Sequence, residues 1–146
     1  MQVDPRGQRF SAILTSIVLV VVLVTSSWWL LAAQALVFII GVLFGLRSAP
    51  YGLVYQAFVR PRLGPPKELE PEAPPRFAQG VGAVFALAGV LGYALGITAL
   101  GMTATAFALI AAFLNAAFGL CLGCEAYLAF RRLTNRPMNP RVPAGR

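Results

Sequence analysis

Two long apolar runs dominate the chain, at residues 10–46 and 77–120, and neither contains Lys, Arg, Asp or Glu. One helix crosses the hydrocarbon core of a bilayer with about 20 apolar residues. Each run is therefore too long for one span and long enough for two. Because backbone polar groups cannot stay unpaired in lipid, each run is expected to fold as a helical hairpin. The pattern predicts an all-α membrane protein whose four transmembrane helices form two tandem hairpins.

Small and polar residues within the runs locate the two turns. Residues 25–27 interrupt the first run just before Trp28 and Trp29, and tryptophan is typical of the headgroup boundary. In the second run, residues 96–101 form the cluster that favours a turn. The transmembrane helices are therefore predicted at residues 10–25, 28–46, 77–96 and 101–121.

The runs divide the chain into five parts. These are an N-terminus (residues 1–9), a first transmembrane hairpin (10–46), a central segment (47–76), a second transmembrane hairpin (77–121) and a juxtamembrane segment with a tail (122–146). In the central segment, residues 50–58 mix aromatic and apolar side chains with nearby arginines, which predicts a short helix lying in the membrane interface. Residues 61–75 contain six prolines and predict an extended, solvated linker.

The distribution of charge orients the predicted spans. All 12 Lys and Arg residues lie outside the apolar runs, and the two predicted turns carry none. Because Lys and Arg mark the cytoplasmic side of a membrane, both termini and the central segment are expected in the cytoplasm. A cleaved signal peptide ending near residues 33–35 is the alternative for the N-terminus, but the apolar run before it is too long and continues to Leu46.

Composition excludes several classes of protein. Apolar residues make up 58% of the chain and charged residues 12%, which excludes a soluble globular domain. A nucleic-acid partner is excluded with it, because no soluble domain supplies a basic face, and the net charge of +7 fits contact with anionic lipid. Histidine is absent and there are only two cysteines, so we expect no metal site and no cofactor.

The two hairpins resemble each other. Arg9-Phe10 opens the first and Arg76-Phe77 opens the second. Phe-Gly-Leu closes both, at residues 44–46 and 118–120, and an aromatic, basic segment follows each closure, at residues 51–61 and 127–137. This pattern predicts a parallel internal repeat with its axis along the membrane normal. Chance similarity between Ala-, Leu- and Gly-rich stretches is the alternative.

The motif most specific for chemistry is Cys121-Leu122-Gly123-Cys124. On a helix, cysteines three residues apart share a face and have Cα atoms about 5 Å apart, within the range of a disulfide. Such a pair can cycle between dithiol and disulfide or relay a persulfide sulfur. The same spacing also suits two inert, packed cysteines or a metal site shared across an oligomer, and the residues alone leave these alternatives open.

The motif is expected at the cytoplasmic end of the last transmembrane helix. There the negative end of the helix dipole and the adjacent Glu125 would disfavour a thiolate. We therefore expect a cation to compensate, with Arg47 as the first candidate, because the repeat puts it in the place of Cys121, and Arg131 as the second. Cys124, nearer to water, is expected to meet a partner first, with Cys121 as the resolving cysteine.

Three polar side chains lie within or at the start of the predicted spans: Gln34, Gln79 and Asn115. Polar groups in lipid usually hydrogen-bond to a neighbouring helix, and we expect that role for all three. The second hairpin is also rich in Gly and Ala at four-residue spacing, which lets helices approach closely. It is therefore expected to form the packed core or a contact between copies in a homo-oligomer.

Several segments together resemble a known bacterial family. They are residues 60–66 (Arg-Pro-Arg-Leu-Gly-Pro-Pro), 75–79 (Pro-Arg-Phe-Ala-Gln) and 114–117 (Leu-Asn-Ala-Ala), followed by the Cys121–Cys124 motif and Tyr127. The chain resembles, over about residues 3–130, the membrane family labelled domain of unknown function 4395. The resemblance implies a four-span protein of the bacterial cytoplasmic (inner) membrane. It also implies a thioredoxin-like or rhodanese-like soluble partner, and a role in thiol or sulfur handling.

The leading functional hypothesis is a multi-pass protein that presents a cytoplasm-facing dithiol for thiol–disulfide or sulfur-transfer exchange with a soluble partner. Two alternatives are a non-catalytic scaffold or accessory subunit with packed cysteines, and a transporter of small anions or sulfur compounds. The sequence does not decide whether the protein is an enzyme. An oxidase for oxidative protein folding is disfavoured, because the single cysteine pair is expected on the reducing side.

Overall fold

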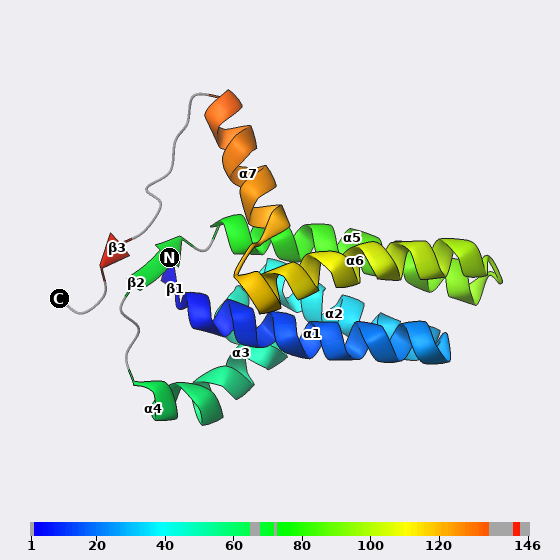
Figure 1. Cartoon of the computed structure of the whole chain (residues 1–146), viewed down its shortest axis with the longest axis horizontal. Helices are drawn as coiled ribbons and strands as arrows, with labels where there is room; N and C mark the ends of the chain where they lie inside the picture. Colours follow the sequence, from blue (N-terminus) through cyan, green and yellow to red (C-terminus); the bar gives the residue numbers. More distant parts are fainter. Residues whose placement is uncertain (1, 65–67, 72, 135–141, 144–146) are drawn as a thin grey trace.

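Four long helices lie side by side and form the body of the protein (Figure 1). The structure, a computed structural model, describes residues 2–64, 68–71, 73–134 and 142–143. The long helices are α1 (Pro5–Thr25), α2 (Trp28–Phe44), α5 (Ala73–Ala94) and α6 (Thr98–Phe118). The α1–α2 and α5–α6 turns lie together at one end of this bundle, and the remaining elements gather at the other end (Figure 1).

The first turn falls where the sequence predicts it, and the second overlaps the predicted residues 96–101 but is shorter, because α6 already begins at Thr98. α1 ends at Ser26, which has a left-handed backbone with φ 55°, and Ser27 caps α2 by accepting a hydrogen bond from the backbone of Leu30. The turn between α5 and α6 contains Gly96 with φ 79°. At the opposite end, Gly119 with φ 70° ends α6 and donates its N–H to the last turn of that helix.

The two hairpins pack extensively against each other, whereas α1 and α2, the two helices of the first hairpin, contact each other much less. α1 lies along α6, α2 lies along α5, and α5 packs on α6. The bundle core contains large side chains from the first hairpin and small ones from the second: Leu19, Val22, Leu31 and Phe38 pack with Ala83, Ala86 and Ala108. A Cβ at Gly92 would collide with the backbone of Gly101, so α5 and α6 cross there without side chains between them.

The outer surface of the bundle is apolar. Exposed side chains include Ile17, Val24, Leu91, Phe107 and Phe113. Three helices, α1, α5 and α6, are long and apolar enough to cross a membrane, and α2 is apolar but shorter, at 17 residues. An outward-facing apolar surface on helices of this length is that of a membrane-spanning protein.

Two arginines tie the hairpins together at the end opposite the turns. Arg9 of α1 donates to the carbonyl oxygens of Ala116 (3.2 Å) and Ala117 (3.4 Å), in the last turn of α6. Arg76 of α5 donates to the carbonyl oxygen of Val42 in the last turn of α2. The first helix of each hairpin therefore caps the second helix of the other hairpin. A cation at these orphan carbonyls also offsets the negative end of each helix dipole.

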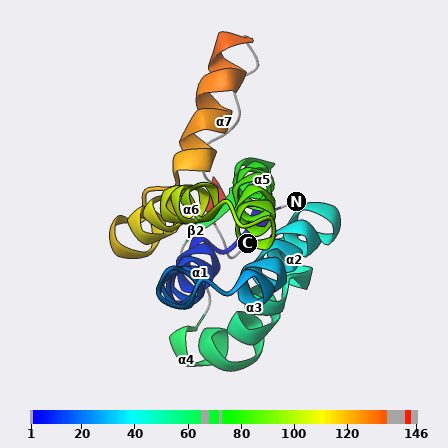
Figure 2. The ribbon, with the colours of Figure 1, turned by 90° about the vertical axis from the view of Figure 1, so that its right-hand side faces the viewer.

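The end of the bundle with the arginines carries two further helical segments. The first is η1 (Leu46–Ser48), α3 (Pro50–Val54), η2 (Tyr55–Val59) and α4 (Arg60–Leu63), and the second is α7 (Leu122–Leu133). They leave the bundle in opposite directions (Figure 2). The short antiparallel strands β1 (Gln2–Val3), β2 (Glu68–Pro71) and β3 (Val142–Pro143) pair in that order at the same end.

Some boundaries differ from the sequence predictions. α1 begins at Pro5 rather than at residue 10, because Asp4 caps it and Pro5 occupies the first turn. The predicted linker 61–75 is only partly extended, since Pro61 lies in the first turn of α4, and Pro74 and Pro75 lie in the first turn of α5. Proline is tolerated there because the first-turn N–H groups have no partner within the helix. Most of the predicted tail lies outside the described residues.

Candidate functional site

The two cysteines begin a separate helix. α6 ends at Phe118, and after a break at residues 119–121 the chain enters α7 with Cys121 as its N-cap. The expectation that the motif lies at the end of the last transmembrane helix is therefore wrong. The expected dipole effect changes sign with it, because the N-terminus of α7 is positive and stabilises a thiolate. The left-handed Gly119 causes the break by turning the backbone out of α6.

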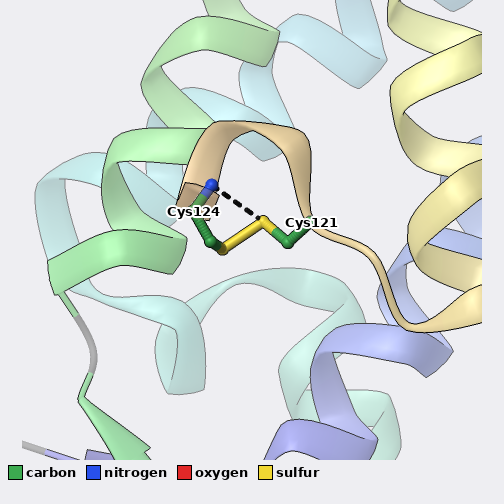
Figure 3. The surroundings of a disulfide bond; sticks show 2 residues. All are labelled: Cys121 and Cys124. Atoms are coloured by element: carbon green, nitrogen blue, oxygen red, sulfur yellow. Dashed lines mark hydrogen bonds between the residues drawn. A yellow bond between two sulfur atoms is a disulfide. The ribbon is translucent and has the colours of Figure 1, made fainter. Parts of the chain in front are cut away.

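Cys121 and Cys124 are joined as a disulfide, with Cα atoms 5.1 Å apart. The backbone N–H of Cys124 donates a hydrogen bond to Sγ of Cys121 at 3.1 Å (Figure 3). The N–H of Glu125 donates to the backbone carbonyl of Cys121 at 3.0 Å. The N-cap sulfur therefore receives the hydrogen bond that a serine or aspartate oxygen supplies at other helix starts. Both cysteines are partly buried.

Gly123 seats this helix start on α5. A Cβ at Gly123 would lie 2.6 Å from Cβ and 2.7 Å from Cα of Ala78, closer than real Cβ contacts. One helical turn further, the ring of Tyr127 lies 5.5 Å from that of Phe77, centroid to centroid. The glycine between the cysteines and the small residue opposite it therefore let the disulfide approach α5 closely.

Three charged residues were expected to favour or disfavour a thiolate at the cysteines. Glu125 is exposed in the first turn of α7, where its carboxylate is favourable to the helix dipole. Arg131 lies in the last turn of α7, seven residues beyond Cys124, with its guanidinium 6.0 Å from the centroid of the Tyr127 ring. The backbone of Arg47 lies in η1, and its side chain lies outside the described part of the chain. Among the described groups, the helix N-terminus therefore takes the role expected of a cation.

A partly open cavity of about 180 Å³ adjoins the disulfide. Its lining comes from α1, α2, α5 and α6 and, at the cysteine end, also from α3, η2 and residues 121–123. Cys121 lines it, whereas Cys124 does not. The two sulfur-bearing residues therefore differ in what they face, although they are three residues apart.

The predicted polar residues divide between two roles. Gln34 is buried, accepts a hydrogen bond from the hydroxyl of Tyr51 at 2.6 Å, and donates to Thr15 at 3.4 Å. Its expected role in joining helices is confirmed. Gln79 and Asn115 instead line the cavity. Within the described residues, no hydrogen bond joins either of these two side-chain amides to another residue.

A polar clasp joins the N-terminus to the segment after α2. Asp4 accepts hydrogen bonds from the hydroxyl of Tyr55 at 2.7 Å and from the guanidinium of Arg6 at 3.0 Å. Arg6 also donates to the carbonyl of Gly64 at 2.8 Å, at the end of α4. Burial and the hydrogen bond to Asp4 raise the pKa of Tyr55 to about 12. Burial alone raises the pKa of Asp4, but the hydrogen bonds from Arg6 and Tyr55 outweigh it and leave the pKa below its usual 3.8.

The sequence offered signals for part of this arrangement. Glycine directly after an apolar helix, followed by an amphipathic stretch with Glu early and two arginines late, is typical of one helix ending and another beginning. The cavity had no such signal, because it depends on how four helices pack. Within the described residues, no cluster of three or more His, Cys, Asp or Glu side chains could hold a metal ion.

The sequence matches the model of a protein family. The family model described as Domain of unknown function (DUF4395) matches residues 3–132, from the N-terminal clasp through the cysteine pair to the last turn of α7. No curated protein and no solved structure matches the chain. Because the family match covers most of the sequence, the chain belongs to the DUF4395 family.

Proposed function

We propose that this protein is a four-span protein of the bacterial cytoplasmic membrane that exchanges thiols and disulfides with a soluble partner on the cytoplasmic side. The observation that carries the proposal is the position of the Cys121–Cys124 disulfide, with Cys121 as N-cap of α7 and hydrogen-bonded to the N–H of Cys124. Cysteine pairs at a helix N-terminus have the electrostatic environment that favours a reactive thiolate.

The arrangement of charge supports the proposed topology. Every basic residue within the described ranges belongs to α1 near its start, η1, α4, the start of α5, or α7. All of these segments gather at the end of the bundle away from the two turns (Figure 1). Because Lys and Arg mark the cytoplasmic side of a membrane, the proposed topology has this end in the cytoplasm, together with the termini and the cysteine pair. In the proposed topology α2 is the fourth span, kept short by Gly45.

Reciprocal contacts support an internal repeat. Arg9 caps α6 as Arg76 caps α2. Phe10 packs on Tyr55 with ring centroids 5.8 Å apart, and Phe77 packs on Tyr127 at 5.5 Å, each pair tilted by 45°. In this register Tyr127 corresponds to Tyr55 rather than to Tyr51. Ala49 is the N-cap of α3, the α-helix after the first hairpin, and Cys121 is the N-cap of α7, the helix after the second. In the repeat, Cys121 therefore corresponds to Ala49 and not to Arg47.

The proposed exchange begins at Cys124. A thiolate of the partner attacks Sγ of Cys124, the Cys121–Cys124 bond breaks, and Cys121 leaves as a thiolate while a mixed disulfide forms. A leaving thiolate that is stabilised leaves faster, and the N-terminus of α7 stabilises Cys121. A second thiolate of the partner then attacks the partner's own sulfur in the mixed disulfide and releases Cys124. The partner is thereby oxidised to a disulfide, and the membrane protein is reduced to a dithiol.

Trapping of the mixed disulfide tests the proposal. Cys121→Ser leaves Cys124 alone, and in lipid nanodiscs it should form a stable mixed disulfide with a thioredoxin-like protein whose attacking cysteine is pre-activated as a thionitrobenzoate adduct. Cys124→Ser is the matched control and should trap at least about fivefold less, because a protein partner cannot enter the cavity that Cys121 lines, whereas a small alkylating reagent can. Trapping by neither variant in folded protein would contradict the proposal, and equal trapping would contradict the assigned order of attack.

A further inference from the structure

The cavity beside Cys121 extends from the cysteine end into the bundle. Along α6 it is lined from Asn115 to Phe107, eight residues or about 12 Å of helix. Along α5 it is lined from Pro75 past Gln79 to Phe85. An apolar cavity of about 150 Å³ is enough to hold a benzene ring, so the 180 Å³ here has room for one ring with substituents.

The cavity is polar at one end and apolar at the other. Gln79 and Asn115 line the cavity toward the cysteine end of the bundle, since Gln79 follows the Ala78 that touches Gly123 and Asn115 lies in the last turn of α6; the side-chain oxygen of Gln79 lies against Gly41 of α2. Their side-chain amides have donors with no partner among the described residues. Phe38, Phe85 and Phe107 line the part further from the cysteines, where Phe107 is also exposed on the outer surface of the bundle. A ligand that fits has a flat ring, carries hydrogen-bond acceptors toward Cys121, and places apolar groups deeper in the bundle.

Charge excludes an ionic ligand in the deeper part. The ionisable lining residues come from the cysteine end of the bundle: Asp4, Tyr51, Tyr55, Arg60 and Cys121. The deeper lining supplied by α1, α2, α5 and α6 contains no ionisable side chain. A neutral ring with carbonyl acceptors matches this lining, because amide N–H groups donate to carbonyl oxygens and aromatic walls pack on the ring.

The proposed exchange also requires an electron acceptor. A cysteine pair on the cytoplasmic side is kept reduced by the thiol pool unless an oxidant re-forms the disulfide. We propose that the cavity binds the head of a lipid-soluble quinone, which re-oxidises the Cys121/Cys124 dithiol; this inference rests on the function proposed above. A quinone is neutral, carries two carbonyl acceptors, dissolves in the bilayer and accepts two electrons.

The step balances in atoms and electrons. The Cys121 thiolate, at the cavity wall, and the Cys124 thiol together give up two electrons as the bond between their sulfurs forms. The quinone takes up those two electrons and two protons, one from the Cys124 thiol and one from solvent, and becomes a hydroquinone. Gln79 and Asn115 donate hydrogen bonds to a carbonyl oxygen on which negative charge develops. Cys124 remains turned away from the cavity and is available to the soluble partner.

Binding to the oxidised protein is the first test, because it requires no exchange activity. The disulfide form in nanodiscs is titrated with decylubiquinone and bound quinone is measured by equilibrium dialysis, with empty nanodiscs as the blank. One saturable site per chain is expected. Ala111→Phe fills the cavity and should weaken binding by about tenfold or more, whereas Ala117→Phe, an exposed position on the same helix outside the cavity, should leave it unchanged.

A second variant guards against misfolding of Ala111→Phe. Asn115→Leu keeps the number and branching of the side-chain heavy atoms and removes the hydrogen-bond donors, and it should slow re-oxidation of the reduced protein by decylubiquinone by about tenfold. Trapping of the soluble partner by the same variant, in the Cys121→Ser background, should be unchanged. The reaction is followed under argon as one hydroquinone formed for each disulfide.

The outcomes separate the two proposals. Absence of a saturable site, equal weakening by Ala111→Phe and Ala117→Phe, or a retained phospholipid that quinone does not displace would overturn the quinone site. If trapping of the partner persists in that case, the proposed exchange stands without it. Quinone binding without any trapping of partner would overturn the exchange and leave a quinone site with another use.

Discussion

The environment of a single sulfur determines what the cysteine pair can do. Cys121 is the N-cap of α7 and receives the N–H of Cys124, whereas Cys124 lies inside the first turn and outside the cavity lining. Both residues belong to one motif, so the sequence predicts the disulfide spacing of about 5 Å that the structure has at 5.1 Å. The sequence predicts the wrong sign for the helix-dipole effect at the cysteines, because that sign depends on whether α6 continues through residue 121.

Alkylation rates test the electrostatic difference between the two cysteines. In single-cysteine variants, Cys121 (in Cys124→Ser) should react with iodoacetamide at pH 7 about two to five times faster than Cys124 (in Cys121→Ser). A helix N-terminus stabilises a nearby anion by about 0.3–1 kcal/mol, and the backbone N–H of residue 124 is kept in both variants. The measurement is the loss of free thiol by mass spectrometry. A faster Cys124 would contradict the assignment of Cys121 as the stabilised thiolate.

The Asp4–Tyr55 clasp predicts how stability depends on pH. Because the pKa of Asp4 is lowered in the folded protein, its contribution to the free energy of unfolding is present above about pH 4 and is lost as the pH falls through the folded value. Because the pKa of Tyr55 is raised to about 12, its contribution is present below about pH 10 and is lost as the pH rises toward 12.

Two variants test the acidic and the alkaline parts of this pH dependence separately. Asp4→Asn should be less stable than wild type at neutral pH, and the difference should shrink below pH 4. Tyr55→Phe should lose the alkaline part of the pH dependence that wild type shows between pH 10 and 12. The measurement is thermal unfolding in detergent across pH. Parallel curves for wild type and both variants would contradict a role for the clasp.

At the scale of the element, the position of α7 depends on close contact rather than on hydrophobic burial. α7 has no buried residue, and its start is held by the contact of Gly123 with Ala78 and by the packing of Tyr127 on Phe77. Gly123→Ala should push α7 off α5 and destabilise the protein by about 1–3 kcal/mol, as overpacking does. The shift should also expose Cys124 to faster alkylation after reduction.

Gly80→Ala is the matched control for that variant. Gly80 lies on α5, two residues from the Ala78 that Gly123 contacts, but a Cβ there meets only Cγ2 of Val42 at an ordinary 3.8 Å. It should be neutral or stabilising, because alanine favours a helix over glycine by about 1 kcal/mol. Unfolding midpoints and thiol reactivity of the two variants are compared. Equal behaviour would mean that the approach of Gly123 to Ala78 does not position the cysteine pair.

The long helices were predictable because an uncharged apolar run in a membrane has few ways to hydrogen-bond its backbone N–H and C=O groups. Residues 25–27 and Gly96 located both turns, and the helix ends differ by a few residues where Asp4 and Gly119 act as caps. The interleaved packing of the hairpins was not predictable, since the pairing of α1 with α6 depends on side chains distant in sequence. The cavity is a product of that pairing, and so the role of Gln79 and Asn115 was missed.

At the scale of the whole molecule, the asymmetry between the two ends of the bundle is what gives the cysteine pair its proposed surroundings. The arginine-rich end carries the three short strands, α4 and α7, and the other end carries two short, uncharged turns (Figures 1 and 2). Translocating the turns costs far less than translocating the arginines, so the turns should be exported and the cysteines retained. In that orientation Cys124 faces the reducing cytoplasm, and a ligand of the cavity enters from the bilayer.

Labelling at the two ends tests this orientation. In a background with Cys121→Ser and Cys124→Ser, Ala99→Cys, exposed in the first turn of α6 next to the α5–α6 turn, should react with a membrane-impermeant maleimide in intact cells. Thr134→Cys, exposed just after α7, should react only in inverted membrane vesicles. A permeant maleimide should label both and serves as the control for folding and expression. Labelling of residue 134 from outside the cell would place the cysteine pair in an oxidising compartment, where its disulfide would need no membrane oxidant.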